Sequence, residues 1–113
     1  MSGITTHVLD TARGRPASNV PVLLEIRSEQ GWQEIGRAET DADGRARQLL
    51  PTGADLTVGV YRLTFGIETY FQAQEIEGFY PEASIVFHVR DAAQHYHVPL
   101  LLSPYGYSTY RGS

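Results

Sequence analysis

Acid–base and anion-binding chemistry in this chain has to come from histidine, arginine, carboxylate and hydroxyl side chains. The 113 residues contain no Cys, and all nine basic residues are Arg. Thiolate nucleophiles, disulfides, thiolate metal ligands and Schiff-base lysines are therefore excluded. A neutral imidazole near pH 7 accepts a proton and an imidazolium returns it, so the four histidines are the first candidates for catalysis.

The spacing of the histidines admits two kinds of site. His95 and His97 are two residues apart, so on a strand both side chains point to the same face, and the apolar alternation around them directs that face away from the core. His88 lies on the polar side of the preceding apolar run. A His-x-His pair is also compatible with zinc, with His7 as a third ligand and water as a fourth. That spacing is permissive for zinc rather than specific, and a surface or hydrogen-bonded role is the commoner one for any single histidine.

Arg45 follows a predicted tight turn, which gives its side chain a defined direction. Residues 41–44 (DADG) end in Asp-Gly, which suits a turn with positive φ. Arg45 and Arg47 share one strand face, where the simplest interpretation is two solvated charges beside Asp41 and Asp43. If Arg45 instead lines a recessed site, its planar guanidinium can hold an anionic or carbonyl-rich ring through two hydrogen bonds.

The serine and tyrosine residues near the C-terminal end are more typical of strand packing or an interface than of a catalytic site. Ser108 or Ser113 could in principle be the nucleophile of a Ser-His-Asp triad. The chain has no G-x-S-x-G motif, which disfavours a serine nucleophile. The tyrosines Tyr105, Tyr107 and Tyr110 are typical of a sheet edge or an interface.

Alternating apolar residues predict the strands that would position these groups. Such runs lie at residues 20–27, 32–40, 56–65, 85–89 and 96–102, and an aromatic strand is expected at 105–110. Residues 67–74 instead have apolar positions at helical spacing, which predicts one helix of about two turns. Seven or eight short strands with frequent turns are typical of an antiparallel sandwich. The last two strands resemble an exposed sheet edge, so we expect a homo-oligomer built from it.

Composition and charge restrict the class of protein. Nine Arg against thirteen Asp and Glu leave a net charge of −4, which disfavours nucleic acid as a partner. The sequence has neither a membrane span of about 18 apolar residues nor a signal peptide, so we expect a soluble, cytoplasmic protein with no membrane partner. Residues 1–113 are expected to form a single domain.

Three segments resemble those of the transthyretin-like 5-hydroxyisourate hydrolases. The first comprises residues 5–11 (TTHVLDT) and 14–17 (GRPA), the second residues 40–45 (TDADGR), and the third residues 95–113 (HYHVPLLLSPYGYSTYRGS). Their order along a chain of matching length makes the resemblance specific. It covers essentially the whole chain and is least informative over residues 66–78.

The resemblance implies a fold, an assembly and an activity. The fold would be an all-β, transthyretin-like sandwich of two four-stranded sheets with one short helix, assembled as a homotetramer with sites at subunit interfaces. The activity would be hydrolysis of 5-hydroxyisourate to 2-oxo-4-hydroxy-4-carboxy-5-ureidoimidazoline in urate and purine catabolism, without a metal or other cofactor. Residue by residue, it implies His7, Arg45 and His97 as catalytic residues, and His7, Arg45, Tyr110, Arg111, Gly112 and Ser113 as the substrate-binding residues.

A water attack on a cyclic amide would use these groups in distinct roles. The two histidines would share the proton transfers in an order that the sequence leaves open, and Arg45 would bind the flat ring and stabilise developing charge. The alternative is a transthyretin-like carrier that binds a small aromatic ligand without catalysis. The resemblance implies that such a carrier lacks this histidine pairing and the Tyr-Arg-Gly-Ser ending.

Overall fold

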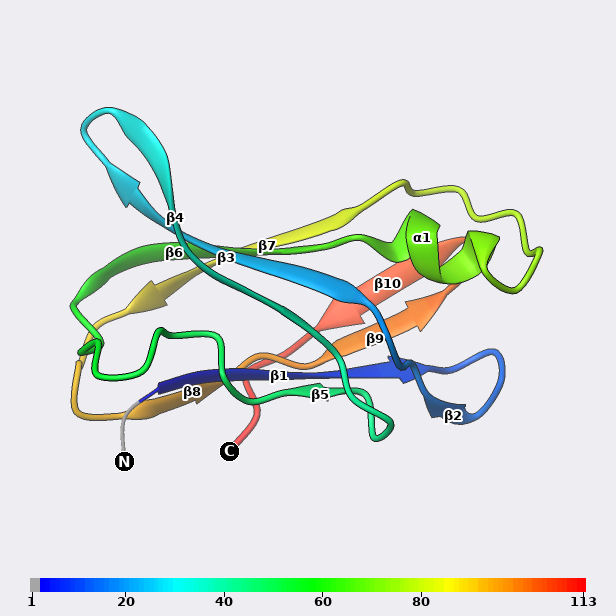
Figure 1. The fold of residues 1–113 in the computed structure, drawn as a ribbon, viewed down its shortest axis with the longest axis horizontal. Coiled ribbons are helices and arrows are strands. Elements are labelled where there is room, and N and C mark those ends of the chain that lie inside the picture. Colours follow the sequence, from blue (N-terminus) through cyan, green and yellow to red (C-terminus); the bar gives the residue numbers. More distant parts are fainter. Residues whose placement is uncertain (1–2) are drawn as a thin grey trace.

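The chain forms two β-sheets packed face to face, with one short helix at an end of the sandwich (Figure 1). The computed structural model describes residues 3–113. The elements within them are β1 (Gly3–Asp10), β2 (Arg15–Pro16), β3 (Pro21–Ser28), β4 (Gly31–Glu39), β5 (Arg45–Ala46), β6 (Gly59–Phe65), α1 (Ile67–Gln72), β7 (Ala83–Val89), β8 (His95–His97), β9 (Leu100–Ser103) and β10 (Gly106–Thr109). The prediction of an all-β sandwich with one short helix is confirmed.

The first sheet is four strands wide, although six strands contribute to it. β1 is central; β8 and β9 pair in succession along one of its sides, β5 and β2 along the other, and β10 pairs with β9. β8 and β9 run parallel to β1, whereas the short strands and frequent turns of the sequence predicted an antiparallel sandwich. The residues between β8 and β9 include Pro99, which has no N–H to donate to a ladder, so the predicted run 96–102 is divided. The edge position of β10 was expected.

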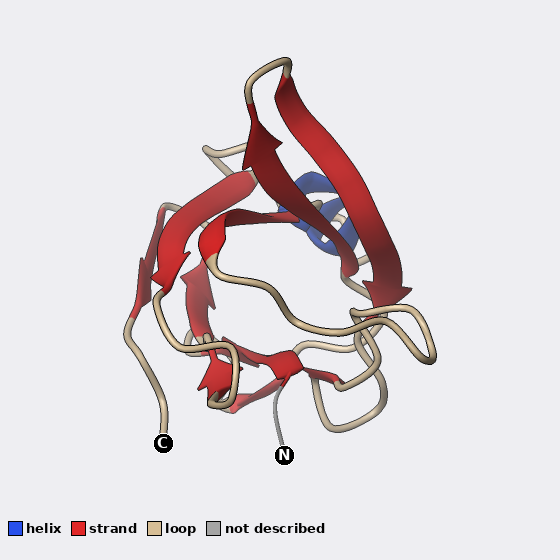
Figure 2. Cartoon of the chain, turned by 90° about the vertical axis from the view of Figure 1, so that its left-hand side faces the viewer, coloured by secondary structure: helices blue, strands red, loops and turns tan. Residues whose placement is uncertain are grey.

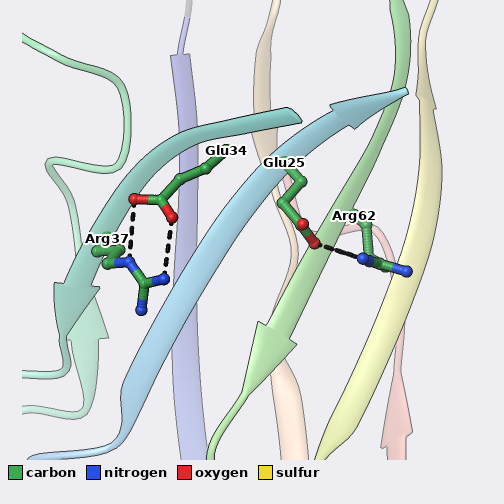
Figure 3. A network of polar contacts seen from close by, with 4 residues as sticks. All are labelled: Glu25, Glu34, Arg37 and Arg62. Carbon is green, nitrogen blue, oxygen red and sulfur yellow. Dashed lines mark hydrogen bonds and ion pairs between the residues drawn. The ribbon is translucent and has the colours of Figure 1, made fainter. Parts of the chain in front are cut away.

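The second sheet has the order β4-β3-β6-β7 and is antiparallel throughout. On the face away from the core its charges pair with one another, as Figure 3 shows. Arg62 and Glu25 are register partners on β6 and β3 and approach to 2.7 Å, and Arg37 holds both carboxylate oxygens of Glu34 at 2.9 Å. The Arg62 guanidinium also lies 4.4 Å from the centre of the Trp32 ring. These arginines are therefore occupied by structural contacts.

Figure 2 shows the two sheets facing each other. The core between them is made by alternating residues of each sheet. The fully buried side chains include Val8 of β1, Leu24 of β3, Leu63 of β6 and Leu100 of β9. Burial of this apolar area, worth about 25 cal/mol per Å², sets which face of each strand points outward. In β1, a strand that apolar alternation did not predict, Thr6 and Asp10 are also buried, so its inward face is too polar to be recognised by hydrophobicity.

The helix is shorter than expected. It ends at Gln72 rather than at Gln74, and Glu75 just beyond it has a φ of 57°, which turns the chain away. Its Tyr70 hydroxyl donates to the buried carboxylate of Asp10 at 2.7 Å, which connects the helix to the end of β1. Within residues 3–113, no helix is long and apolar enough to cross a membrane.

Candidate active site

The candidate site lies on the outer face of the first sheet. Along β1, Ile4, Thr6 and Val8 are buried, whereas Thr5 and His7 alternate with them and are partly exposed. Because side chains alternate across a strand, Thr5 and His7 share the face directed away from the core. The N-terminal strand therefore contributes a hydroxyl and an imidazole to one surface.

The strands on either side of β1 bring the other predicted residues beside these two. In the registers of the two ladders, Thr5 is the partner of His97 on β8, and His7 is the partner of Arg45 on β5. Neighbouring strands are separated by about 4.8 Å, so groups on three adjacent strands can reach one small molecule. The structure thus brings His7, Arg45 and His97 together, although they lie in three distant segments of the sequence.

A cavity of about 470 Å³ opens on this face. The residues that line it are Thr5, Thr6, Arg45, Arg47, His95, His97 and Ser113. His7 is not among the lining residues. Its Nε2 lies 2.8 Å from the carbonyl oxygen of Asp43, and because a carbonyl only accepts, Nε2–H is the donor.

The turn before Arg45 is held by one carboxylate. Asp41 Oδ1 accepts from the backbone N–H groups of Asp43 at 2.9 Å and of Arg45 at 3.0 Å. These bonds, that to Arg45 foremost, lower the pKa of Asp41 below its usual value. Gly44 has a φ of 77°, and a Cβ there would lie 2.4 Å from the carbonyl oxygen of Val8, so this position requires glycine. The turn therefore delivers Arg45 to β5 in a fixed register with β1.

The two arginines of this segment differ in their partners. Arg47 donates to Asp41 Oδ2 at 3.1 Å, as expected for a solvated ion pair. The guanidinium of Arg45 is in no ion pair with a carboxylate of residues 3–113. Arg45 also lines the cavity, where a carbonyl or an anion could accept hydrogen bonds from its guanidinium.

The environment of His97 favours its neutral form. Partial burial lowers the pKa of the imidazole, and electrostatic interactions with Arg45, His7 and His95 lower it further. His97 Nδ1 lies 2.9 Å from the Thr5 hydroxyl, whereas its Nε2 has no hydrogen-bond partner in the part of the chain that the structure describes. A neutral, half-buried imidazole with one unoccupied nitrogen is suited to accept a proton.

The predicted residues of the C-terminal tail divide between two places. Ser113 lines the cavity, and Gly112 forms a β-bridge with His97, donating its N–H to the His97 carbonyl at 2.8 Å. Arg111 instead stacks 4.6 Å from the centre of the Tyr96 ring, and with Tyr110 it borders a separate hollow of about 250 Å³. Within a single chain, the Tyr110 and Arg111 side chains thus line that hollow and not the cavity of His97.

Four residues that line the cavity were not among the predicted site residues: Thr5, Thr6, Arg47 and His95. Thr5 and His95 both contact it, and the Thr5 hydroxyl lies between the two imidazoles. The signal for Thr5 was its position two residues before His7, which places both on one face if the segment is a strand. The fourth histidine, His88, is exposed on β7 of the other sheet.

The described residues do not form the ligand set that a zinc site would need. Within residues 3–113, no three His, Cys, Asp or Glu side chains lie close enough together to hold a metal ion. His95 and His97 direct one nitrogen each at the Thr5 hydroxyl, and His7 is bonded to the carbonyl of Asp43.

Comparison with known proteins agrees with this architecture. A model of the HIUase/Transthyretin family matches residues 4–112. A 5-hydroxyisourate hydrolase of Caulobacter vibrioides is 50% identical over 117 residues, covering 100% of both chains. Among solved structures, the 5-hydroxyisourate hydrolase of Klebsiella pneumoniae has a TM-score of 0.85 at 34% identity over 99% of this chain and 100% of that one. Transthyretin from Sparus aurata has a TM-score of 0.90 at 30% identity, covering 99% and 97%. With a family match across nearly its whole length and a relative sharing half its residues, the chain belongs to the HIUase/Transthyretin family.

Proposed function

We propose that this chain hydrolyses 5-hydroxyisourate to 2-oxo-4-hydroxy-4-carboxy-5-ureidoimidazoline in purine catabolism. The hydrolase relatives support this substrate. The observation that carries the proposal is the convergence of an Arg45 guanidinium without an ion-pair partner among residues 3–113 and the His7 and His97 imidazoles on one sheet face. That face combines a proton acceptor with donors for a carbonyl-rich ring.

The reaction needs a base for water and donors for the oxygen that becomes negative. In the proposed step the water oxygen bonds to a ring acyl carbon, the ring C–N bond breaks, and the departing nitrogen takes a proton. His97 is the proposed base, because its pKa is lowered and its Nε2 is unoccupied. Arg45 holds the ring and stabilises the developing oxyanion. His7, whose Nε2–H donates to Asp43, orients water or returns the proton.

The proposed mechanism assigns the whole rate enhancement to side chains of the protein, without a metal or other cofactor. A positioned base contributes about 10²–10⁴-fold and an oxyanion donor about 10²–10³-fold. An open cavity on a sheet face is sufficient for rate enhancements of this order.

We also propose that the chain acts as a homotetramer with its sites at subunit interfaces. The site is an outer sheet face, which a second copy would cover. The β10 edge adds an exposed aromatic group in which Tyr80 stacks edge-to-face on Phe79 at 4.8 Å and on Tyr107 at 5.2 Å. Contiguous exposed aromatic side chains of this kind are typical of interfaces.

The competing function is a carrier of a small aromatic ligand. The fold resembles the transthyretin structure as closely as the hydrolase structure, so the fold favours neither function. The cavity favours catalysis, because its lining includes two imidazoles and two guanidiniums.

The decisive experiment follows the absorbance of freshly generated 5-hydroxyisourate with and without the protein. Accelerated decay that persists after thorough chelation and depends on Arg45 supports the metal-independent hydrolase. Decay at the buffer rate excludes it in favour of a carrier, and activity lost on chelation and restored by a metal ion would require a metal mechanism instead.

A further inference from the structure

One hydroxyl joins two imidazoles at the edge of the cavity. Thr5 Oγ1 lies 2.8 Å from His95 Nε2 and 2.9 Å from His97 Nδ1. Both distances are those of good hydrogen bonds. The contacts follow from the register of β1 and β8, since Thr5 is the partner of His97 and His95 projects from the same face of β8.

The number of protons on these three groups restricts their arrangement. A threonine hydroxyl carries one hydrogen, so it donates to only one of the two rings. If Thr5 donates to His97 Nδ1, then His95 Nε2–H donates to Thr5, and the proton of neutral His97 is on Nε2. If Thr5 donates to His95 Nε2, then His97 Nδ1–H donates to Thr5, and His97 Nε2 carries a lone pair. A third arrangement, in which both rings donate, leaves the hydroxyl hydrogen without either ring as acceptor.

Only one of these arrangements is both fully bonded and ready for the proposed reaction. A base must begin with a lone pair on its reacting nitrogen, which for His97 is Nε2. After His97 takes a proton, both ring nitrogens carry hydrogen, and Nδ1–H still donates to Thr5. The hydroxyl can then keep its own hydrogen bond only by donating to an unprotonated Nε2 of His95. No hydrogen bond of this chain has to change when the proton arrives.

We propose that His95, acting through the Thr5 hydroxyl, is a positioning residue that holds His97 in the tautomer with hydrogen on Nδ1 and a lone pair on Nε2. The catalytic meaning of this relay rests on the function proposed above, whereas the tautomer itself is a property of the folded chain. The relay also fixes the plane of the His97 ring, because it binds Nδ1 from β1 while the Gly112 backbone packs against the opposite side: a Cβ there would lie 2.6 Å from His97 Cδ2.

The first test reads the tautomer directly and needs no substitution. In the full chain labelled with ¹⁵N-histidine, at a pH well above the ordinary histidine pKa of about 6.5, long-range ¹H–¹⁵N correlation distinguishes the protonated ring nitrogen from the unprotonated one. The expected result is protonated Nδ1 and unprotonated Nε2 in His97. Hydrogen on Nε2 of His97 overturns the proposal, whether or not the protein hydrolyses 5-hydroxyisourate.

The second test substitutes the two residues of the relay, His95 and Thr5, one at a time. His95→Phe and Thr5→Val should shift His97 toward hydrogen on Nε2 and lower kcat by about tenfold, within the range of a mispositioned base, with less effect on KM. Thr5→Ser keeps the hydroxyl and should retain both the tautomer and kcat. His88 lies on the other sheet, so His88→Phe is the matched control. It should change neither the His97 tautomer nor kcat.

The variants separate positioning from simple structural damage. If His95→Phe leaves the tautomer of His97 and kcat as they are in the parent chain, His95 has no positioning role. If kcat falls as much in Thr5→Ser as in Thr5→Val, the hydroxyl is not the connecting group, and the proposed relay is wrong. Failure of the parent chain to hydrolyse the substrate would refute the proposed function while leaving the tautomer measurement fully interpretable.

Discussion

At the scale of residues, the site depends on which charged groups already have partners. Arg62, Arg37 and Arg47 are each committed to a carboxylate, whereas Arg45 is in no ion pair within residues 3–113. A guanidinium whose donors are not occupied by the protein can use them for a ligand. The same logic applies to His97, whose Nδ1 is bound and whose Nε2 is not.

Substitution of the three proposed catalytic residues should lower turnover. We expect His7→Ala, Arg45→Ala and His97→Ala each to reduce kcat for 5-hydroxyisourate by at least about tenfold, because each removes a proton-transfer or electrostatic contribution. Absorbance kinetics measure the loss, and circular dichroism checks that the fold is kept. His88→Ala, on the other sheet, is the control. A His97→Ala variant with the parental kcat would remove His97 from the mechanism.

The pH dependence of kcat/KM should report the base. The pKa of His97 is lowered by burial and, less strongly, by electrostatic interactions with Arg45, His7 and His95, so the neutral base persists below the ordinary value of 6.5. Activity should therefore be constant above that value and fall only at lower pH, as His97 gains a proton. Arg45→Gln removes one of the lowering charges and should move the midpoint of the residual activity to higher pH. A midpoint above 6.5 in the parent chain would contradict this assignment.

At the scale of elements, short segments hold the side chains of the site. The two-residue strand β5 positions Arg45, and the tail after β10 bridges to β8 at His97. Neither segment buries enough area to be stable alone, so both depend on hydrogen bonds to their neighbours.

The close approach of the Gly112 backbone to the His97 ring predicts a requirement for glycine at position 112. In Gly112→Ala, the new Cβ would meet His97 Cδ2 at 2.6 Å, so the ring or the tail must move, and movement of the ring would strain its bond to Thr5. We expect kcat to fall by about tenfold or more while the melting temperature changes little, since the tail contributes little core. Gly66→Ala, whose Cβ would meet only ordinary contacts with Pro21, is the control. Unchanged kcat in Gly112→Ala would show that the tail does not set the ring position.

The contact between helix and sheet makes a prediction about stability. Tyr70 donates to Asp10 at 2.7 Å, and both side chains are buried. Tyr70→Phe leaves a buried carboxylate oxygen without this donor and should cost about 1–3 kcal/mol in the free energy of unfolding. Urea denaturation measures the loss, with the exposed Tyr105→Phe as control. Equal stability of the two variants would show that another donor replaces the hydroxyl.

At the scale of the whole molecule, the site lies on an outer sheet face rather than between the sheets. A cavity so placed is open to water until something covers it, and a second copy of the chain is the proposed cover. Exclusion of water would strengthen the electrostatic contribution of Arg45.

Disrupting the aromatic edge should therefore reduce assembly and activity together. Tyr107, on β10, is partly exposed and stacks on Tyr80. Tyr107→Glu would place a charge within the exposed aromatic group of the proposed interface, so we expect a smaller particle in sedimentation velocity and a kcat lowered by at least about tenfold. Val58→Glu, at an exposed position outside the strands, is the control. A monomeric Tyr107→Glu variant with full activity would show that each chain carries a complete site.

The sequence determined much of the fold, and its composition restricted any catalysis to histidine, arginine, carboxylate and hydroxyl groups or to a metal that they hold. Alternation at residues 20–27 and 56–65 predicted β3 and β6, apart from the first three residues of the second run, because those strands bury one face against apolar neighbours. Apolar alternation did not predict β1, because its inward face includes the polar Thr6 and Asp10, whose burial is stabilised by hydrogen bonds from elsewhere in the chain. The two-residue strand β2 was also missed, since it is too short to have a periodic pattern, whereas the strand face predicted for Arg45 and Arg47 proved to be only the two residues of β5.

The predicted site residues came from the resemblance to the family, because composition and spacing alone left a surface or hydrogen-bonded role as the commoner one for each histidine. Tertiary structure decided which of these groups meet. Thr5 and His97 are 92 residues apart, and only the parallel register of β1 with β8 places a hydroxyl between two imidazoles. Such registers depend on long-range packing, because contacts across so large a separation are selected by the whole core and not by the residues that make them.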